Sequence, residues 1–83
     1  MPLSVLEAMA SGLPVIATDV GDIGRAVVHN VSGLLVGKKS PSELALSIER
    51  LLEDPGLRRR MGEAGRERAA EHFSDKAMRL IHN

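Results

Sequence analysis

A buried β-strand is predicted at residues 14–18, where the sequence reads Pro14-Val15-Ile16-Ala17-Thr18. β-Branched residues favour strands, and an apolar run without polar alternation is typical of a strand that is covered on both faces, as in a parallel sheet. A second buried strand is predicted at Gly33-Leu34-Leu35-Val36-Gly37, after a turn. A glycine-containing loop and then a short helix or turn around residues 25–28 are expected between the two strands. The pattern therefore indicates two strands joined by a crossover connection.

A short helix is predicted before the first strand, over residues 3–10, with Gly12 as its C-terminal stop. Ser4 followed by Glu7 has the spacing of a capping box, in which the serine is the N-cap and the glutamate reaches back to it. The spacing gives Glu7 a structural task that competes with any role in binding.

A second helix is predicted to begin at Ser40-Pro41-Ser42-Glu43, which combines an N-cap serine, a proline at the first helical position and a capping-box glutamate. The helix is expected to be amphipathic and to end near Asp54. Its apolar stripe consists of Leu44, Ile48, Leu51 and Leu52.

A third helix is predicted to begin at Asp54-Pro55, weakened by Gly62 and Gly65. Phe73 is expected to anchor its end. Ser74-Asp75 is expected to cap a separate final turn, whose apolar residues are Met78, Leu80 and Ile81.

The composition excludes several classes of function. The 83 residues carry 11 basic and 11 acidic side chains, so the net charge of zero offers no steering toward nucleic acid. The chain contains no cysteine, which excludes thiolate zinc sites and a cysteine nucleophile and fits a reducing compartment, so a cytoplasmic location is expected. No apolar run approaches the length of a membrane span, which is about 20 residues.

The predicted fold class is α/β. A two-stranded parallel sheet has two bare edges and two faces to cover, and 83 residues supply too little material to cover them all. The chain is therefore expected to be the distal part of a larger doubly wound, Rossmann-like domain, with about two parallel strands and flanking helices.

The segment Pro2-Leu3-Ser4-Val5-Leu6-Glu7-Ala8-Met9-Ala10-Ser11-Gly12-Leu13-Pro14-Val15-Ile16-Ala17-Thr18 closely resembles the donor-site segment of retaining glycosyltransferases with the GT-B architecture. The resemblance continues, in the order expected for that family, as far as residue 75. It runs through Val20-Gly21-Asp22-Ile23, Gly33-Leu34-Leu35-Val36, Leu57-Arg58, Met61-Gly62, Gly65-Arg66 and Phe73-Ser74.

The resemblance implies that residues 1–83 are part of a C-terminal nucleotide-sugar-binding domain. Glu7 matches a family glutamate whose carboxylate accepts hydrogen bonds from the ribose hydroxyls. The backbone amides around Leu3, Ser4 and Val5 are then expected to face the diphosphate, without a bound metal. No catalytic residue is assigned. Three further parts of the family's site would precede Met1: the other donor-site glutamate, the basic side chains that help to bind the diphosphate, and the acceptor domain. The isolated chain is therefore expected to be inactive.

Arg25 departs from the family pattern, because relatives commonly carry a glutamate near that position. The arginines of the last third of the chain alternate with glutamates and are interpreted as a solvated face, and the histidines are assigned no role. A second hypothesis is a non-catalytic α/β module whose strand edges and apolar helix faces dock on a partner chain, or on the rest of the enzyme.

Overall fold

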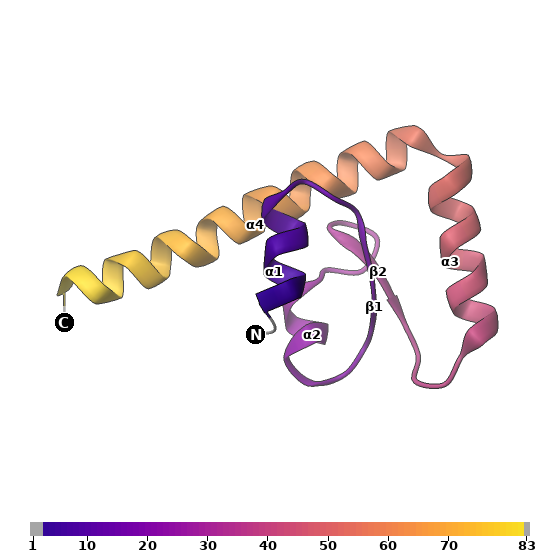
Figure 1. Ribbon diagram of the computed structural model, residues 1–83, viewed down its shortest axis with the longest axis horizontal. Helices are drawn as coiled ribbons and strands as arrows, with labels where there is room; N and C mark the ends of the chain where they lie inside the picture. The colour runs from indigo at the N-terminus through magenta and orange to yellow at the C-terminus, as the bar shows by residue number, and fades with distance from the viewer. Residues whose placement is uncertain (1–2, 83) are drawn as a thin grey trace.

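The computed structural model describes residues 3–82 of the chain, and the side chains of residues 4–74. Helices and strands follow one another in the predicted α/β order (Figure 1). They are α1 (Leu3–Ala10), β1 (Val15–Thr18), α2 (Gly21–Ala26), β2 (Gly33–Val36), α3 (Pro41–Glu53) and α4 (Pro55–His82).

The two strands form a parallel sheet, as predicted, with Val15 opposite Gly33 and Thr18 opposite Val36. The close pairing requires the glycine, since a Cβ atom at residue 33 would lie 2.4 Å from the Val15 carbonyl oxygen. The crossover between the strands contains α2, which begins at Gly21 rather than near residue 25.

Helices cover both faces of the sheet, with α1 and α2 on one side and α3 on the other (Figure 1). Helix α4 runs past the end of the sheet at which the strands begin, and contributes to the buried clusters on both faces. On the α1 side the cluster contains Met9, Ala26, Val27 and Ala69, against Val5, Val15 and Leu35. On the α3 side it contains Leu34, Leu51, Leu57 and Met61, against Ile16.

Helix α1 ends as predicted, with a Schellman motif at Gly12. The Gly12 N–H donates to the Met9 carbonyl (3.0 Å) and the Leu13 N–H donates to the Ala8 carbonyl (3.1 Å). Gly12 has a φ of 74°, in the left-handed region that glycine adopts without a steric penalty.

Helix α4 corrects the prediction for the C-terminal part of the chain. It is one helix of 28 residues that continues through Phe73 and Ser74-Asp75, so these residues neither end a helix nor cap a new turn. Phe73 is 44% exposed and makes an edge-on contact with His72 at 5.7 Å between ring centroids. The side chains of Met78, Leu80 and Ile81 lie outside the described side chains.

Helix α3 begins at Pro41 as predicted, but most of its apolar stripe is uncovered. Leu51 is 7% exposed, whereas Leu44 and Ile48 are each 43% exposed and Leu52 is 71% exposed. The described part of the chain therefore buries Leu51 and leaves the other three residues of the stripe exposed. None of the described helices is long and apolar enough to cross a membrane.

Candidate functional site

The predicted site residues Leu3, Ser4, Val5 and Glu7 lie on α1, which has one buried face and one exposed face. Leu6 and Met9 are buried, and Val5 packs against the core on the α1 side of the sheet. Ser4 and Glu7 are both exposed, one turn apart. The side chain of Leu3 lies outside the described side chains, but its backbone begins the helix. Two of the predicted residues, Ser4 and Glu7, thus present polar groups on one open face.

The capping-box prediction for these residues is wrong. Helix α1 begins at Leu3, so Ser4 is already inside its first turn and is not the N-cap. Among the side chains of residues 4–74, the Ser4 hydroxyl and the Glu7 carboxylate take part in no hydrogen bond or ion pair. The structural task that competed with a binding role for Glu7 is therefore absent.

The N-terminal end of α1 lies beside α2, at the end of the molecule toward which β1 runs (Figure 1). The turn between β1 and α2 is tight, because the Val20 N–H donates back to the Thr18 carbonyl (2.9 Å) and Gly21 has a φ of 48°. Ligands of open α/β sheets bind outside the carboxyl ends of the strands. The exposed face of α1 therefore begins at the end of the sheet where such a ligand is expected.

Arg68, which lies on α4, fixes the C-terminal end of α2 through two hydrogen bonds. Its Nε donates to the Ala26 carbonyl and its Nη2 donates to the Arg25 carbonyl, each at 3.2 Å. Both acceptors lie in the last turn of α2, where carbonyls have no helical partner. The Arg25 side chain itself is exposed. The side chain that departs from the family pattern at Arg25 therefore lies on the surface, whereas the backbone carbonyl of Arg25 is bound by Arg68.

Arg68, Arg58 and His29 are structural residues that the sequence did not reveal. The Arg58 guanidinium donates to the carbonyls of Leu51 and Leu52 at the end of α3, and His29 Nδ1 accepts from the Leu35 N–H at 2.9 Å. These partners lie six or more positions away along the chain. No short-range pattern signals them.

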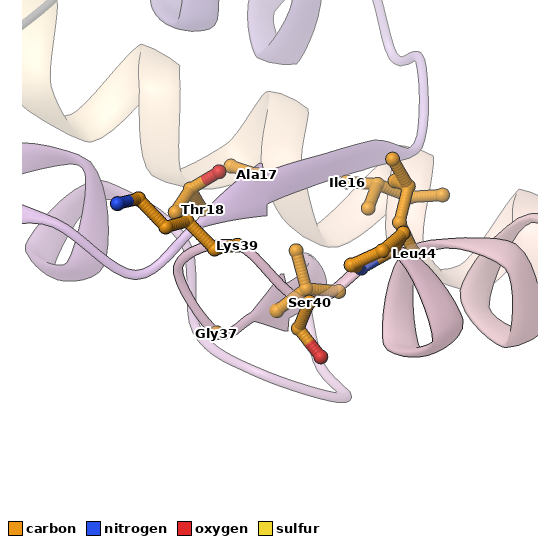
Figure 2. A pocket seen from close by; sticks show the side chains of 9 residues that line it. Ile16, Ala17, Thr18, Gly37, Lys39, Ser40 and Leu44 are labelled. Atoms are coloured by element: carbon orange, nitrogen blue, oxygen red, sulfur yellow. The ribbon is translucent and has the colours of Figure 1, made fainter.

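A separate pocket of about 310 Å³ opens between β1 and the start of α3 (Figure 2). It lies on the α3 face of the sheet and contains none of the predicted site residues. Ile16 and Leu44 lie on one side, and Thr18 and Lys39 lie on the other. The remaining lining residues are Ala17, Val36, Gly37, Ser40 and Pro41. Within the described residues, no group of three or more acidic, histidine or cysteine side chains is arranged to hold a metal ion.

The fold and this site define a partial Rossmann-like domain whose polar helix face stands at the ligand-binding end of a parallel sheet. The chain belongs to the family of glycosyl transferases group 1, whose model matches residues 1–68. It is 45% identical over 76 residues to a D-inositol 3-phosphate glycosyltransferase of Streptomyces bingchenggensis, a match that covers 90% of this chain and 16% of the relative.

Solved structures agree with the family assignment and with the predicted fold. A sucrose-phosphate synthase from Thermosynechococcus elongatus matches with a TM-score of 0.84 and 37% identity, over 99% of this chain and 22% of the synthase. The C-terminal domain of a glycosyl transferase group 1 family protein from Francisella tularensis matches with a TM-score of 0.78 and 34% identity, over 86% of this chain and 36% of that domain. The fold is thus that of a part of a GT-B C-terminal domain, and the chain spans well under half the length of each of these proteins.

Proposed function

We propose that this chain is the nucleotide-sugar-binding portion of a glycosyltransferase that moves a sugar from a nucleotide-sugar donor to an acceptor with retention of configuration. The proposal rests on Ser4 and Glu7 of α1, in a chain that belongs to the group 1 family. Both are exposed, and neither side chain has a hydrogen-bond or ion-pair partner among the described residues. A carboxylate that accepts no hydrogen bond from the described residues keeps its full acceptor capacity for a ligand.

In this proposal Glu7 holds the ribose of the donor nucleotide. An ionised carboxylate has two oxygens, so one side chain can accept hydrogen bonds from two neighbouring hydroxyls. Its backbone is anchored because Leu6 and Met9, on the opposite side of α1, are buried. The packing of one helix face would therefore fix the position of the carboxylate on the other.

The first turn of α1 would hold the diphosphate. The N–H groups of Leu3, Ser4 and Val5 belong to that turn and have no partner within the helix, and the helix dipole adds partial positive charge. When the sugar leaves, negative charge develops on the diphosphate, and fixed donors that face it lower the barrier. No divalent cation is required in this proposal.

The isolated chain would bind a donor and not transfer its sugar. Catalysis depends on holding donor and acceptor together, and this chain matches only 16% of the Streptomyces relative. Acceptor binding would reside in the parts of the enzyme that this match does not reach. A cytoplasmic location is part of the proposal, because a chain without cysteine suits a reducing compartment.

The proposal is tested by amide-resolved NMR of the isotope-labelled chain, titrated in turn with UDP, GDP and ADP in the presence of a metal chelator. Shifts concentrated at residues 3–8 with one of the nucleotides are the expected result, and they would identify the donor base. A dispersed spectrum that responds to none of them would refute a donor site on α1. Sugar transfer by the pure chain would refute the predicted inactivity.

A further inference from the structure

Side chains of the same chain cover the outer edge of β2. The Leu35 N–H donates to His29 Nδ1 (2.9 Å), and the Gly37 N–H donates to Glu43 Oε2 (2.7 Å). These bonds use two N–H groups of the edge, so it is closed to a further strand. The same bonds fix the positions of an imidazole and a carboxylate beside the strand.

A second pocket, of about 320 Å³, lies along this covered edge, between β2 and α3. Volumes of about 300–1,000 Å³ are typical of small-molecule sites. Its lining consists of residues in and before β2 and of one stripe of α3: His29, Leu35 and Val36, and Glu43, Leu46, Ser47 and Arg50. The α3 residues recur at intervals of three and four positions, so they share one face of the helix. This face is distinct from the apolar stripe of α3.

The polar side chains of this pocket are held in place and keep unused hydrogen-bonding groups. Arg50 Nη1 donates to Asn30 Oδ1 (2.8 Å). Because His29 accepts a hydrogen bond at Nδ1, its neutral imidazole carries the proton on Nε2. Within the described residues, this Nε2–H, the second carboxylate oxygen of Glu43, the other N–H groups of Arg50 and the Ser47 hydroxyl have no partner. A ligand would therefore meet groups that are already ordered.

The two ends of the pocket differ in charge. Arg50 bonds to the residue that follows His29, so the guanidinium and the imidazole lie at the same end. Glu43 is seven positions before Arg50, about 10 Å away along the helix axis. The two side chains form no ion pair with each other. One end of the pocket thus offers a cation with additional N–H donors, and the other offers a carboxylate.

This arrangement selects a ligand by its chemistry. The fork of an arginine matches the oxygens of a carboxylate or a phosphate. A glutamate and a serine hydroxyl suit the hydroxyls of a ligand, which donate and accept hydrogen bonds. Leu46, which is 65% exposed, supplies an apolar surface on the same helix face. A second anionic group would be repelled by Glu43, and an anion without hydroxyls would leave Glu43 and Ser47 unpaired.

We propose that this pocket binds a small sugar or polyol that carries one oxyanion group, either phosphate or carboxylate. Arg50 and His29 hold the oxyanion, and Glu43 and Ser47 hold hydroxyl groups. The inference goes beyond the proposed function and uses no residue of α1. The donor site and this pocket can therefore fail independently of each other.

The experiment is amide-resolved NMR of the isotope-labelled chain without nucleotide. The chain is titrated separately with glucose 6-phosphate, glucuronate, glucose and inorganic phosphate. We expect saturable shifts at the amides of Leu35, Gly37 and Ser47 with at least one of the two sugar anions. Glucose and inorganic phosphate should bind at least about tenfold more weakly, since each lacks one half of the recognised groups.

Three results of the titrations would overturn the proposal. The first is the absence of saturable shifts around the pocket with both sugar anions, including the case in which the shifts concentrate at residues 3–8. The second is equally tight binding of inorganic phosphate or of glucose. The third is equally tight binding of 6-aminohexanoate, which would assign the pocket to zwitterions.

Two variants make the test specific. Arg50→Gln removes the cation, and Glu43→Gln removes the negative charge but keeps an amide oxygen that can accept from the Gly37 N–H. Each should weaken binding of the sugar anion at least about fivefold. The controls are Arg59→Gln and Glu49→Gln, which make the same charge changes at exposed positions outside the pocket. Equal losses in variants and controls would reduce the effect to net charge and overturn the proposal. The wild-type titrations decide the matter if either variant fails to fold.

Discussion

Gly62 of α4 lies directly against Gly12, where α1 has just ended. A Cβ atom at Gly62 would lie 2.1 Å from the Gly12 carbonyl oxygen, closer than real Cβ atoms approach any backbone atom. The contact brings α4 against the segment that leads into β1. It joins the glycine of the Schellman motif that ends α1 to a residue in the N-terminal half of α4. Because both sides of the contact are backbone, a side chain at Gly62 could be accommodated only if α4 or the end of α1 shifted as a whole.

Gly62→Ala is expected to destabilise the chain by about 1–3 kcal/mol, the usual cost of overpacking a close contact. Urea denaturation followed by circular dichroism measures the loss in free energy of unfolding. Gly65→Ala is the matched control, since the atoms nearest to its Cβ lie at 3.6 and 3.7 Å, which is ordinary contact. Gly65→Ala should be neutral or stabilising through its helix propensity. Equal effects of the two substitutions would contradict the proposed close approach.

Arg68→Ala is expected to lower the free energy of unfolding by about 1–2 kcal/mol and to speed amide exchange in α2. The reason is that the guanidinium holds two carbonyls of the last turn of α2. Arg66→Ala, which removes an exposed arginine from the same helix, should change neither quantity. Unchanged exchange in α2 after Arg68→Ala would show that the helix is held by other contacts.

Asp54→Ala and Ser40→Ala are expected to differ, although both residues have the sequence of an N-cap. Asp54 Oδ1 accepts from the Leu57 N–H at 2.9 Å, whereas Ser40 makes no side-chain capping bond. Loss of the Asp54 cap should cost about 1 kcal/mol, and loss of the Ser40 side chain should cost a few tenths at most. Thermal unfolding of the two variants compares them directly, and a larger loss at Ser40 would reverse the assignment.

Leu51→Ala and Ile48→Gln are expected to separate the covered part of α3 from its open part. Leu51 is 7% exposed, so its truncation should cost about 2–5 kcal/mol. Ile48 is 43% exposed, so Ile48→Gln should leave the stability of the free chain within about 0.5 kcal/mol. The measurement is urea denaturation of both variants. A strong destabilisation by Ile48→Gln would mean that the apolar stripe is already buried in solution.

Glu7→Gln is expected to weaken nucleotide binding about tenfold without changing stability, since it removes a charged acceptor that has no partner among the described residues. Isothermal titration calorimetry with the nucleotide identified by NMR gives the affinity. Glu49→Gln, at an exposed position of α3, is the control for the loss of one negative charge. An equal loss of affinity in both variants would point to a general charge effect.

Most helix and strand boundaries could be predicted from the sequence, because the interactions that set them act within one turn or one strand. Gly12 ends α1 through hydrogen bonds that reach back to Met9 and Ala8, and Pro41 starts α3 at its first position. The strands at 15–18 and 33–36 follow from short apolar runs. The placement of Ser4 and Glu7 on one side of α1 follows from the helical period.

What the sequence could not determine depends on partners that are distant along the chain. Local propensity predicts that Gly62 and Gly65 weaken a helix, whereas α4 continues through both and uses Gly62 for a close approach to Gly12. The hydrogen bond from Arg68 to the Arg25 carbonyl joins residues that are 43 positions apart. The hydrogen bond from the Leu35 N–H to His29 Nδ1 forms only because the turn between them brings β2 back beside His29. The sequence by itself thus determined where α1, α3 and the two strands form, but neither the start of α2 nor the unbroken course of α4. Only the tertiary structure decided which sheet edge is closed, which apolar face stays open and whether Glu7 is free to bind, because each of these depends on which groups meet across the fold.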